Sequence, residues 1–179
     1  MFQFLRGRRH ERAGYLLYGA AVAAARAPVF YTDLGVPDTL DGRFDLVGLH
    51  VFLLIRRLRA LPPPGADLAQ AVFDAMFHDM DMNLREIGVG DMSIAKKVKQ
   101  MWEAFHGRAA AYATALAAGD AVALEAALAR NVWRGAARPG QAAALARVAL
   151  AQDAHLGTQG LAGFAAGEAR FLAGAEAPA

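Results

Sequence analysis

The residues best suited to chemistry are histidines and carboxylates on three separate stretches of the chain. His50 precedes the dipeptide His78-Asp79, and Asp120 or Asp153 could add a further carboxylate. Imidazole nitrogens and carboxylate oxygens are ligands of divalent transition metals, and a metal held by them can activate a bound water molecule. The set therefore allows one hypothesis, a hydrolytic metal centre.

The order of these residues is similar to that of the metal ligands in helical metal-dependent phosphohydrolases, but the support is thin. A chain with five histidines and 17 acidic residues contains one His-Asp dipeptide by chance, and the basic residue that usually follows the pair is missing. The other interpretation of His50 is a buried histidine satisfied by a neighbour. The sequence has no cysteine, no glycine-rich nucleotide loop and no H-E-x-x-H motif. We therefore expect no catalytic residue, no bound metal and no cofactor.

A second group of polar side chains lies between residues 77 and 86. On a helix, Asp79, Asn83 and Glu86 would share one face, and Asp81 would pair with Arg85. Such carboxylates could bind a metal or act as an acid and a base. The favoured interpretation is structural: they fix helix ends and orient arginine side chains. The arginines expected as partners are Arg43, Arg57 and Arg85.

All five methionines after the first residue fall within 26 residues. They are Met76, Met80, Met82, Met92 and Met101. Flexible thioethers suit a surface that accepts varied apolar partners, although the same spacing is compatible with core packing. Core packing is expected for most of them, and a role in binding stays open.

Helices must position these residues, because apolar side chains recur at three- and four-residue intervals along most of the chain. Hydrophobic residues make up 56% of the sequence and charged residues 20%, which excludes a disordered chain. No alternating strand pattern or internal repeat is present. The pattern predicts an all-α, single-domain bundle of about six helices. The expected helices cover residues 11–27, 46–61, 67–87, 91–118, 120–132 and 141–153, with a structured connector at 28–44.

Charge is concentrated at the N-terminus. Residues 1–12 form a basic arm with four arginines against one glutamate, and the rest of the chain has a net charge of −1. So small a net charge outside the arm argues against DNA as a partner. The apolar stretch after the arm also fits a signal peptide, but it is too short to span a bilayer, and we expect a packed helix. The expected location is cytoplasmic, with peripheral contact at the inner face of the membrane as a further option.

Three stretches resemble signatures of the ubiquinol-cytochrome c chaperone family. The first reads YTDLGVPDTLDGRFD at residues 31–45, followed by LHVFL at 49–53 and Arg57-Leu58. The second reads DMDMNLREIGVGDM at residues 79–92, with KKVK at 96–99 and FHGR at 105–108. The third is ALARN at residues 127–131, and the resemblance covers about residues 28–134.

The resemblance implies an all-helical assembly factor of the cytochrome bc complex, in a bacterial member of the family. Mitochondrial members bind newly made cytochrome b together with a small partner protein. The expected client is therefore cytochrome b or another polytopic membrane subunit, with a co-chaperone and contact of basic residues with the ribosome or membrane surface as further options. Residues 13–156 would form the chaperone-like domain, and residues 157–179 a tail rich in glycine and alanine.

The signature also supplies the candidates for client or partner binding. They are Tyr31, Asp33, Val36, Pro37, Asp38, Asp41, Gly42, Arg43, Phe44, His50, Arg57, Asp79, Met80, Asp81, Asn83, Arg85, Glu86, Gly90, Asp91, Met92 and Lys96.

Overall fold

The computed structural model describes the backbone of residues 2–173 and the side chains of residues 10–90 and 93–173. This part of the chain forms eight helices and no strand, which confirms the all-α prediction. The expected number of about six was too low, because α2 and α8 have only four and five residues and show no apolar period. The helices are α1 (Phe2–Ala25), α2 (Val29–Thr32), α3 (Leu40–Arg59), α4 (Gly65–Glu86), α5 (Asp91–Ala118), α6 (Ala121–Val132), α7 (Gln141–Gly157) and α8 (Leu161–Ala165).

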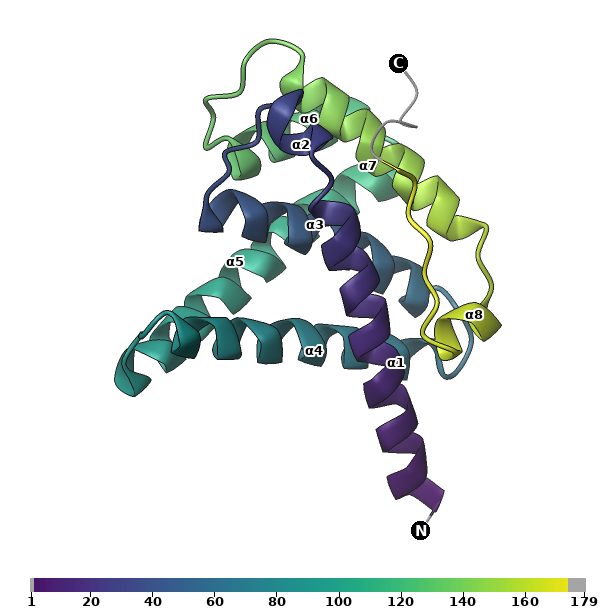
Figure 1. Ribbon diagram of the computed structural model, residues 1–179. Helices are drawn as coiled ribbons and strands as arrows, with labels where there is room; N and C mark the ends of the chain where they lie inside the picture. The colour runs from purple at the N-terminus through teal and green to yellow at the C-terminus, as the bar shows by residue number, and fades with distance from the viewer. Residues whose placement is uncertain (1, 174–179) are drawn as a thin grey trace.

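Helix α3 is the centre of the fold, and it packs against α1, α4, α5, α6 and α7 (Figure 1). Its residues 49–55 are all buried, as expected for a stretch in which apolar side chains cover the whole circumference of a helix. In Figure 1 its first turns lie on the left, above the α4–α5 hairpin, and its last turns lie on the right. The helix therefore connects two sides of the molecule.

Helix α3 begins six residues before the expected start. The backbone N–H of Gly42 donates to Oγ1 of Thr39 at 3.1 Å, so Thr39 caps the first turn. A Cβ on Gly42 would collide with the carbonyl oxygen of Pro37. The turn-like residues of this segment therefore build a helix start, not a loop.

Helix α1 crosses α4 at close range (Figure 1). A Cβ placed on Gly14 would lie 2.6 Å from the backbone carbonyl carbon of Ala71. Only glycine allows the two helices to approach this closely. None of the helices within residues 2–173 is long and apolar enough to cross a bilayer.

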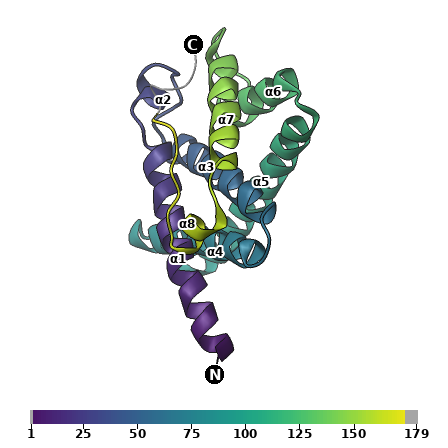
Figure 2. The same ribbon diagram turned by 90° about the vertical axis from the view of Figure 1, so that its right-hand side faces the viewer.

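The chain returns to the body of the fold after α7. Phe164 of α8 is fully buried, and residues 168–173 then run between α1 and α7 in both views (Figures 1 and 2). We call residues 168–173 the C-terminal strap. Part of the region expected as a tail thus belongs to the packed structure.

Candidate functional site

An open groove lies where the first turns of α3 meet the end of α4 and the middle of α5. Its volume is about 370 Å³. We call it the α3–α5 groove. Its lining residues are Leu40, Asp41, Phe44, Leu84, Ile87, Lys97, Gln100, Met101, Ala104, Arg108 and Arg134.

The groove exposes apolar side chains to solvent. Leu40 is 72% exposed and Ile87 is 61% exposed, although residues of this kind are usually buried. Phe44, Leu84 and Met101 are half-buried beside them. Apolar surface that is gathered in one groove and rimmed by charge is typical of a site that binds another molecule.

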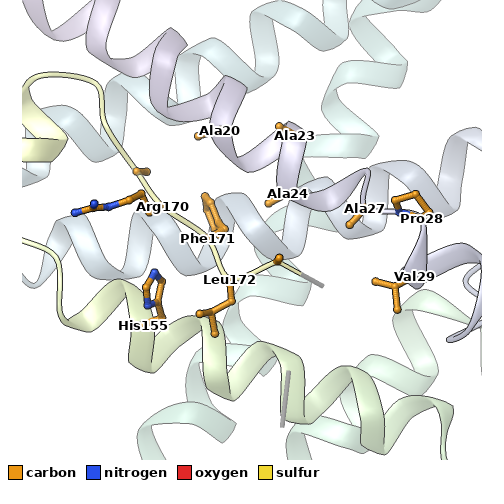
Figure 3. A pocket seen from close by; sticks show the side chains of 12 residues that line it. Ala20, Ala23, Ala24, Ala27, Pro28, Val29, His155, Arg170, Phe171 and Leu172 are labelled. Atoms are coloured by element: carbon orange, nitrogen blue, oxygen red, sulfur yellow. The ribbon is translucent and has the colours of Figure 1, made fainter. Parts of the chain in front are cut away.

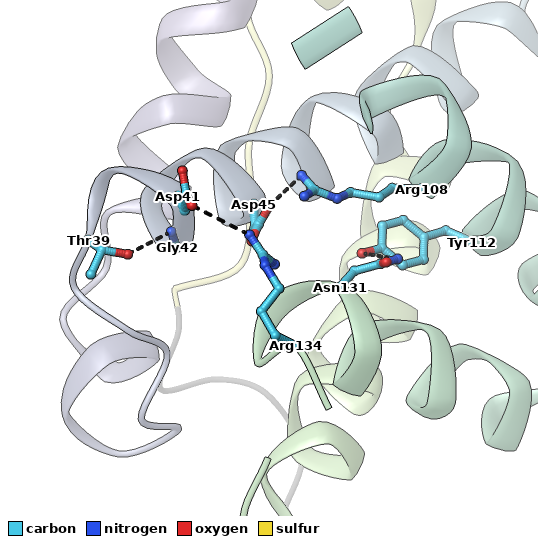
Figure 4. Close-up of polar contacts among 8 residues, drawn as sticks. All are labelled: Thr39, Asp41, Gly42, Asp45, Arg108, Tyr112, Asn131 and Arg134. Carbon is cyan, nitrogen blue, oxygen red and sulfur yellow. Dashed lines mark hydrogen bonds and ion pairs between the residues drawn. The ribbon is translucent and has the colours of Figure 1, made fainter. Parts of the chain in front are cut away.

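A buried carboxylate beneath the groove holds two arginines from distant parts of the chain (Figure 4). The side chain of Asp45 is fully buried, and its Oδ1 forms an ion pair with Arg108 of α5. Nη1 of Arg134, in the loop after α6, donates to the other oxygen at 2.7 Å. Asp41 lies 4.0 Å from Nη2 of Arg134. Both arginines line the groove, so Asp45 fixes positive charge at its wall.

Burial is the main influence on this carboxylate. It raises the pKa of Asp45 to about 6, and the attraction of Arg108 and Arg134 opposes the rise. At neutral pH the group is therefore ionised. Arg108 also lies over the ring of Phe44, with 5.6 Å from its guanidinium carbon to the ring centroid.

The loop that carries Arg134 is itself fixed in place. Nε1 of Trp133 donates to the carbonyl oxygen of Gly35 at 3.1 Å, which ties the loop to the connector before α3. Arg134 has a φ of +56°, a left-handed conformation that is rare for residues other than glycine. The fold thus holds Arg134 in an unfavourable conformation that brings its guanidinium to Asp45.

The sequence patterns identified neither Asp45 nor its two arginine partners as candidates for this ion cluster. One signal was present, because Asp45 directly precedes a long apolar run and is the only carboxylate on the buried part of α3. A charged group in that position is buried and needs partners. Its partners lie far along the chain, and no local spacing identifies them.

The signature residues of the connector divide between contacts within the fold and exposed positions. The hydroxyl of Tyr31 donates to the carbonyl oxygen of Ala25 at 3.1 Å, and Val36 is buried. Asp38 accepts from Nε of Arg43 at 2.6 Å in an exposed pair. The other two connector positions, Asp33 and Pro37, are exposed.

The polar group on α4 is split between two roles. Asp79 accepts from the hydroxyl of Tyr18 at 2.6 Å and so ties α1 to α4. Burial raises the pKa of Tyr18, which keeps its hydroxyl protonated. Asp81 pairs with Nε of Arg85 at 2.7 Å, which confirms the expected pair. The two remaining candidates lie on the surface, where Nδ2 of Asn83 donates to the carbonyl oxygen of Asp79 and Glu86 is exposed.

The expected partners of the other two arginines were wrong. Arg43 pairs with Asp38 of the connector and not with a carboxylate of α4. Nη2 of Arg57 donates to the carbonyl oxygen of Gln159 at 2.8 Å. The first contact is local to the connector and the start of α3, and the second joins residues far apart in the sequence, so the spacing within α4 could show neither.

The methionines also divide. Met76 and Met80 are buried in the core, whereas Met82 is exposed and Met101 lines the α3–α5 groove. A charge at Met80 would therefore disturb folding before it reported on binding. Of the other candidates near the α4–α5 tip, Gly90 precedes α5 and Lys96 is exposed, while the side chains of Asp91 and Met92 lie outside the described residues.

The histidines do not assemble a metal centre. His50 is buried, its Nδ1 lies 2.8 Å from the carbonyl oxygen of Leu46, and its ring contacts Phe30 and Phe171. His50 is therefore buried and bonded to a neighbour through Nδ1, as expected, but its Nε2 has no hydrogen-bond partner within the described residues. Burial lowers its pKa to about 4. His78 is exposed. Among the side chains that the structure describes, no three or more histidines and carboxylates could hold a metal ion, so the arrangement does not support the phosphohydrolase alternative.

The described part of the chain is thus an all-α protein with an apolar groove rimmed by charged side chains. The chain belongs to the ubiquinol-cytochrome C chaperone family, whose model matches residues 32–171. This finding confirms the resemblance seen in the sequence.

Individual relatives agree with this family. The crystal structure of the Cbp3 homolog from Brucella abortus has a TM-score of 0.86 and 34% sequence identity, and the match covers 99% of this chain and 100% of that chain. The ubiquinol-cytochrome-c reductase complex assembly factor 1 of Xenopus laevis is 23% identical over 120 residues, which are 67% of this chain and 60% of that protein. The mitochondrial protein CBP3 of Saccharomyces cerevisiae is 32% identical over 111 residues, 60% of this chain and 32% of that protein. The chain thus matches less than two thirds of the length of either curated relative.

Proposed function

We propose that this protein is a non-catalytic assembly chaperone that binds newly made cytochrome b, or another polytopic membrane subunit, and supports assembly of the cytochrome bc complex. Its membership in the family and the names of its relatives support this function. The observation that carries it is the α3–α5 groove, which combines exposed apolar side chains with fixed positive charge.

The apolar part of the groove suits an unassembled membrane helix. Such a helix aggregates in water unless its apolar surface is covered. Leu40 and Ile87 offer exposed aliphatic surface, and the flexible thioether of Met101 can adapt to different side chains. A chaperone of this kind needs transient contact and no bond-making chemistry.

The charged part of the groove suits the polar ends of such helices. Lys97, Arg108 and Arg134 line the same groove, while Asp45 is buried beneath it. Complementary charge increases the rate of encounter and sets orientation more than it increases affinity. We therefore expect the preferred segments to carry acidic residues next to their apolar stretch.

The proposal includes a cytoplasmic site of action at the inner face of the membrane, with a small co-chaperone and ribosomal or lipid surfaces as further contacts. Several basic residues already have partners in the fold: Arg56 forms an ion pair with Asp153, and Lys99 lies 3.8 Å from Glu103. Lys96 and Lys97 remain as exposed cations near the groove. They are the candidates for contact with an anionic surface.

The test is a pair of charge substitutions in the groove with a matched control. Leu40→Asp and Ile87→Asp each place a carboxylate on exposed apolar groove surface, and Val122→Asp does the same on α6, where Val122 is 76% exposed. We expect the groove variants to capture ribosome-bound cytochrome b chains about tenfold less well, and the control to match the wild type. Equal capture by all four proteins, each with an unchanged melting curve, would exclude the groove.

A deletion strain tests the client itself. Loss of the protein should lower cytochrome b and the assembled cytochrome bc complex and leave their transcripts unchanged, because the proposed action is on the new polypeptide. Normal cytochrome b levels in that strain would remove the client assignment.

A further inference from the structure

The C-terminal strap is held by two glutamine side chains. Gln152 donates from Nε2 to the carbonyl oxygen of Leu172, and its Oε1 accepts from the N–H of Leu172, both at 2.9 Å. Gln159 binds Arg170 in the same way, at 2.6 Å and 2.9 Å. Each side-chain amide thus forms the pair of main-chain hydrogen bonds that a residue of a neighbouring β-strand would form.

These four hydrogen bonds contact only the main chain of the strap. Arg170 and Leu172 are two residues apart, so in an extended segment their N–H and C=O groups point toward the same edge. Any extended peptide could form the same bonds. Selectivity must come from the residue between them, Phe171, whose ring lies 5.6 Å from the ring of His50.

The surface beneath the strap is a built site. Gln152 is only 1% exposed, so its amide would lose buried hydrogen bonds if the strap left without a replacement. Gln159 is held in turn by Arg57 of α3 through its carbonyl oxygen. The strap therefore depends on two signature residues, His50 and Arg57, and the match to the family model ends at Phe171.

The strap does not fill the space beside it. A cavity of about 830 Å³ lies between the strap, the end of α1 and α7 (Figure 3). Small side chains leave it open and make it largely apolar. The lining residues outside the strap are Ala20, Ala23, Ala24, Ala27, Pro28, Val29 and His155.

We propose that the seam between α1 and α7 is a binding site for an extended peptide segment with an aromatic residue, and that the strap is its intramolecular occupant. A partner segment of this chemistry would displace the strap, form the same main-chain bonds with Gln152 and Gln159, and extend into the cavity. The strap competes at the high effective concentration of a tethered ligand, which restricts binding to partners already held elsewhere on the protein. The site does not depend on cytochrome b being the client.

The experiment uses the full chain and a fluorescently labelled peptide that copies residues 167–173. In Phe171→Ala the tethered occupant is weakened, and we expect this variant to bind the peptide at least about tenfold more tightly than the wild type. Arg170→Ala is the matched control, because its side chain is exposed and the strap uses only its main chain. It should bind like the wild type.

Two further measurements make the result decisive. A peptide with alanine in place of the phenylalanine should bind Phe171→Ala no more tightly than it binds the wild type. The protein that carries both Phe171→Ala and Gln152→Ala should likewise show no increase in affinity for the original peptide. On the wild-type chain, added peptide should speed hydrogen exchange at the amides of Arg170 and Leu172, a readout that stands even if a variant fails to fold. Equal binding by wild type and Phe171→Ala, or exchange unaffected by the peptide, would show that the strap is a permanent part of the fold and would overturn the proposal.

Discussion

Replacing Asp45 with asparagine separates two explanations of the buried ion cluster, stability of the fold and placement of charge at the groove. The substitution keeps the size of the side chain and removes its charge. Oδ1 of asparagine can still accept from one arginine, whereas its Nδ2 cannot accept from the other. The half-exposed Arg134 is the partner that should be released into solvent.

The pKa of Asp45 sets the expected size of the effect. A rise from 3.8 to about 6 means that the folded protein favours the neutral carboxyl, by up to about 3 kcal/mol relative to the unfolded chain. The unfolded chain loses this proton near pH 4, and the folded protein keeps it until about pH 6. The free energy of unfolding of the wild type therefore falls as the pH rises through this window and is constant above it.

Asparagine does not ionise, so the free energy of unfolding of Asp45→Asn does not fall in this way as the pH rises. Above pH 6 we expect Asp45→Asn to be as stable as the wild type, or more stable by up to about 3 kcal/mol, with the difference closing near pH 4. Urea unfolding followed by circular dichroism at pH 4 to 8 measures this directly. Capture of cytochrome b chains should fall in the same variant, because Arg134 leaves the groove.

Asp45→Ala is the control, since it removes the buried acceptor that Arg108 and Arg134 share and opens a cavity, and it should be less stable than the wild type at every pH. The reasoning fails if Asp45→Asn is less stable than the wild type by about 3 kcal/mol at pH 7. The ion pairs would then outweigh the cost of burying the charge.

Three other substitutions test single features of the fold, each by chemical unfolding. Burial lowers the pKa of His50 to about 4, so the unfolded chain gains its proton first, and the wild type should lose stability as the pH falls from about 6.5 to about 4. His50→Leu should not show this loss. Thr39→Ala should cost about 1 kcal/mol through loss of the cap on α3, and Thr39→Ser should restore it. Gly14→Ala should cost about 1 to 3 kcal/mol where α1 crosses α4, while Gly19→Ala, with open space around it on the same helix, should be neutral or stabilising.

The sequence predicted those parts of the fold that depend on local patterns. The long helices follow from apolar periodicity, and the pair between Asp81 and Arg85 follows from the four-residue spacing on a helix. The early start of α3 was missed because Asp41 and Gly42 favour turns in isolation, and the cap at Thr39 overrides that preference. The last helix and the strap were missed because segments rich in glycine and alanine carry little pattern.

The candidate site depended on contacts between distant residues. Asp45 meets Arg134 across 89 residues of sequence, and Gln152 meets Leu172 through a main chain that any sequence could supply. Neither contact leaves a repeating spacing in the chain. The family signature includes residues that line the α3–α5 groove and residues that support the strap, but the sequence alone does not show which of them are exposed and which hold the fold together.

The signature on α3 therefore does not mark a single surface. At the start of the helix, Asp41 and Phe44 line the α3–α5 groove, whereas at its far end Arg57 supports the strap through Gln159. A helix of 20 residues is about 30 Å long, so these two ends cannot contact one small segment together. The same largely buried helix thus positions residues of both proposed sites, the α3–α5 groove at its start and the strap at its end.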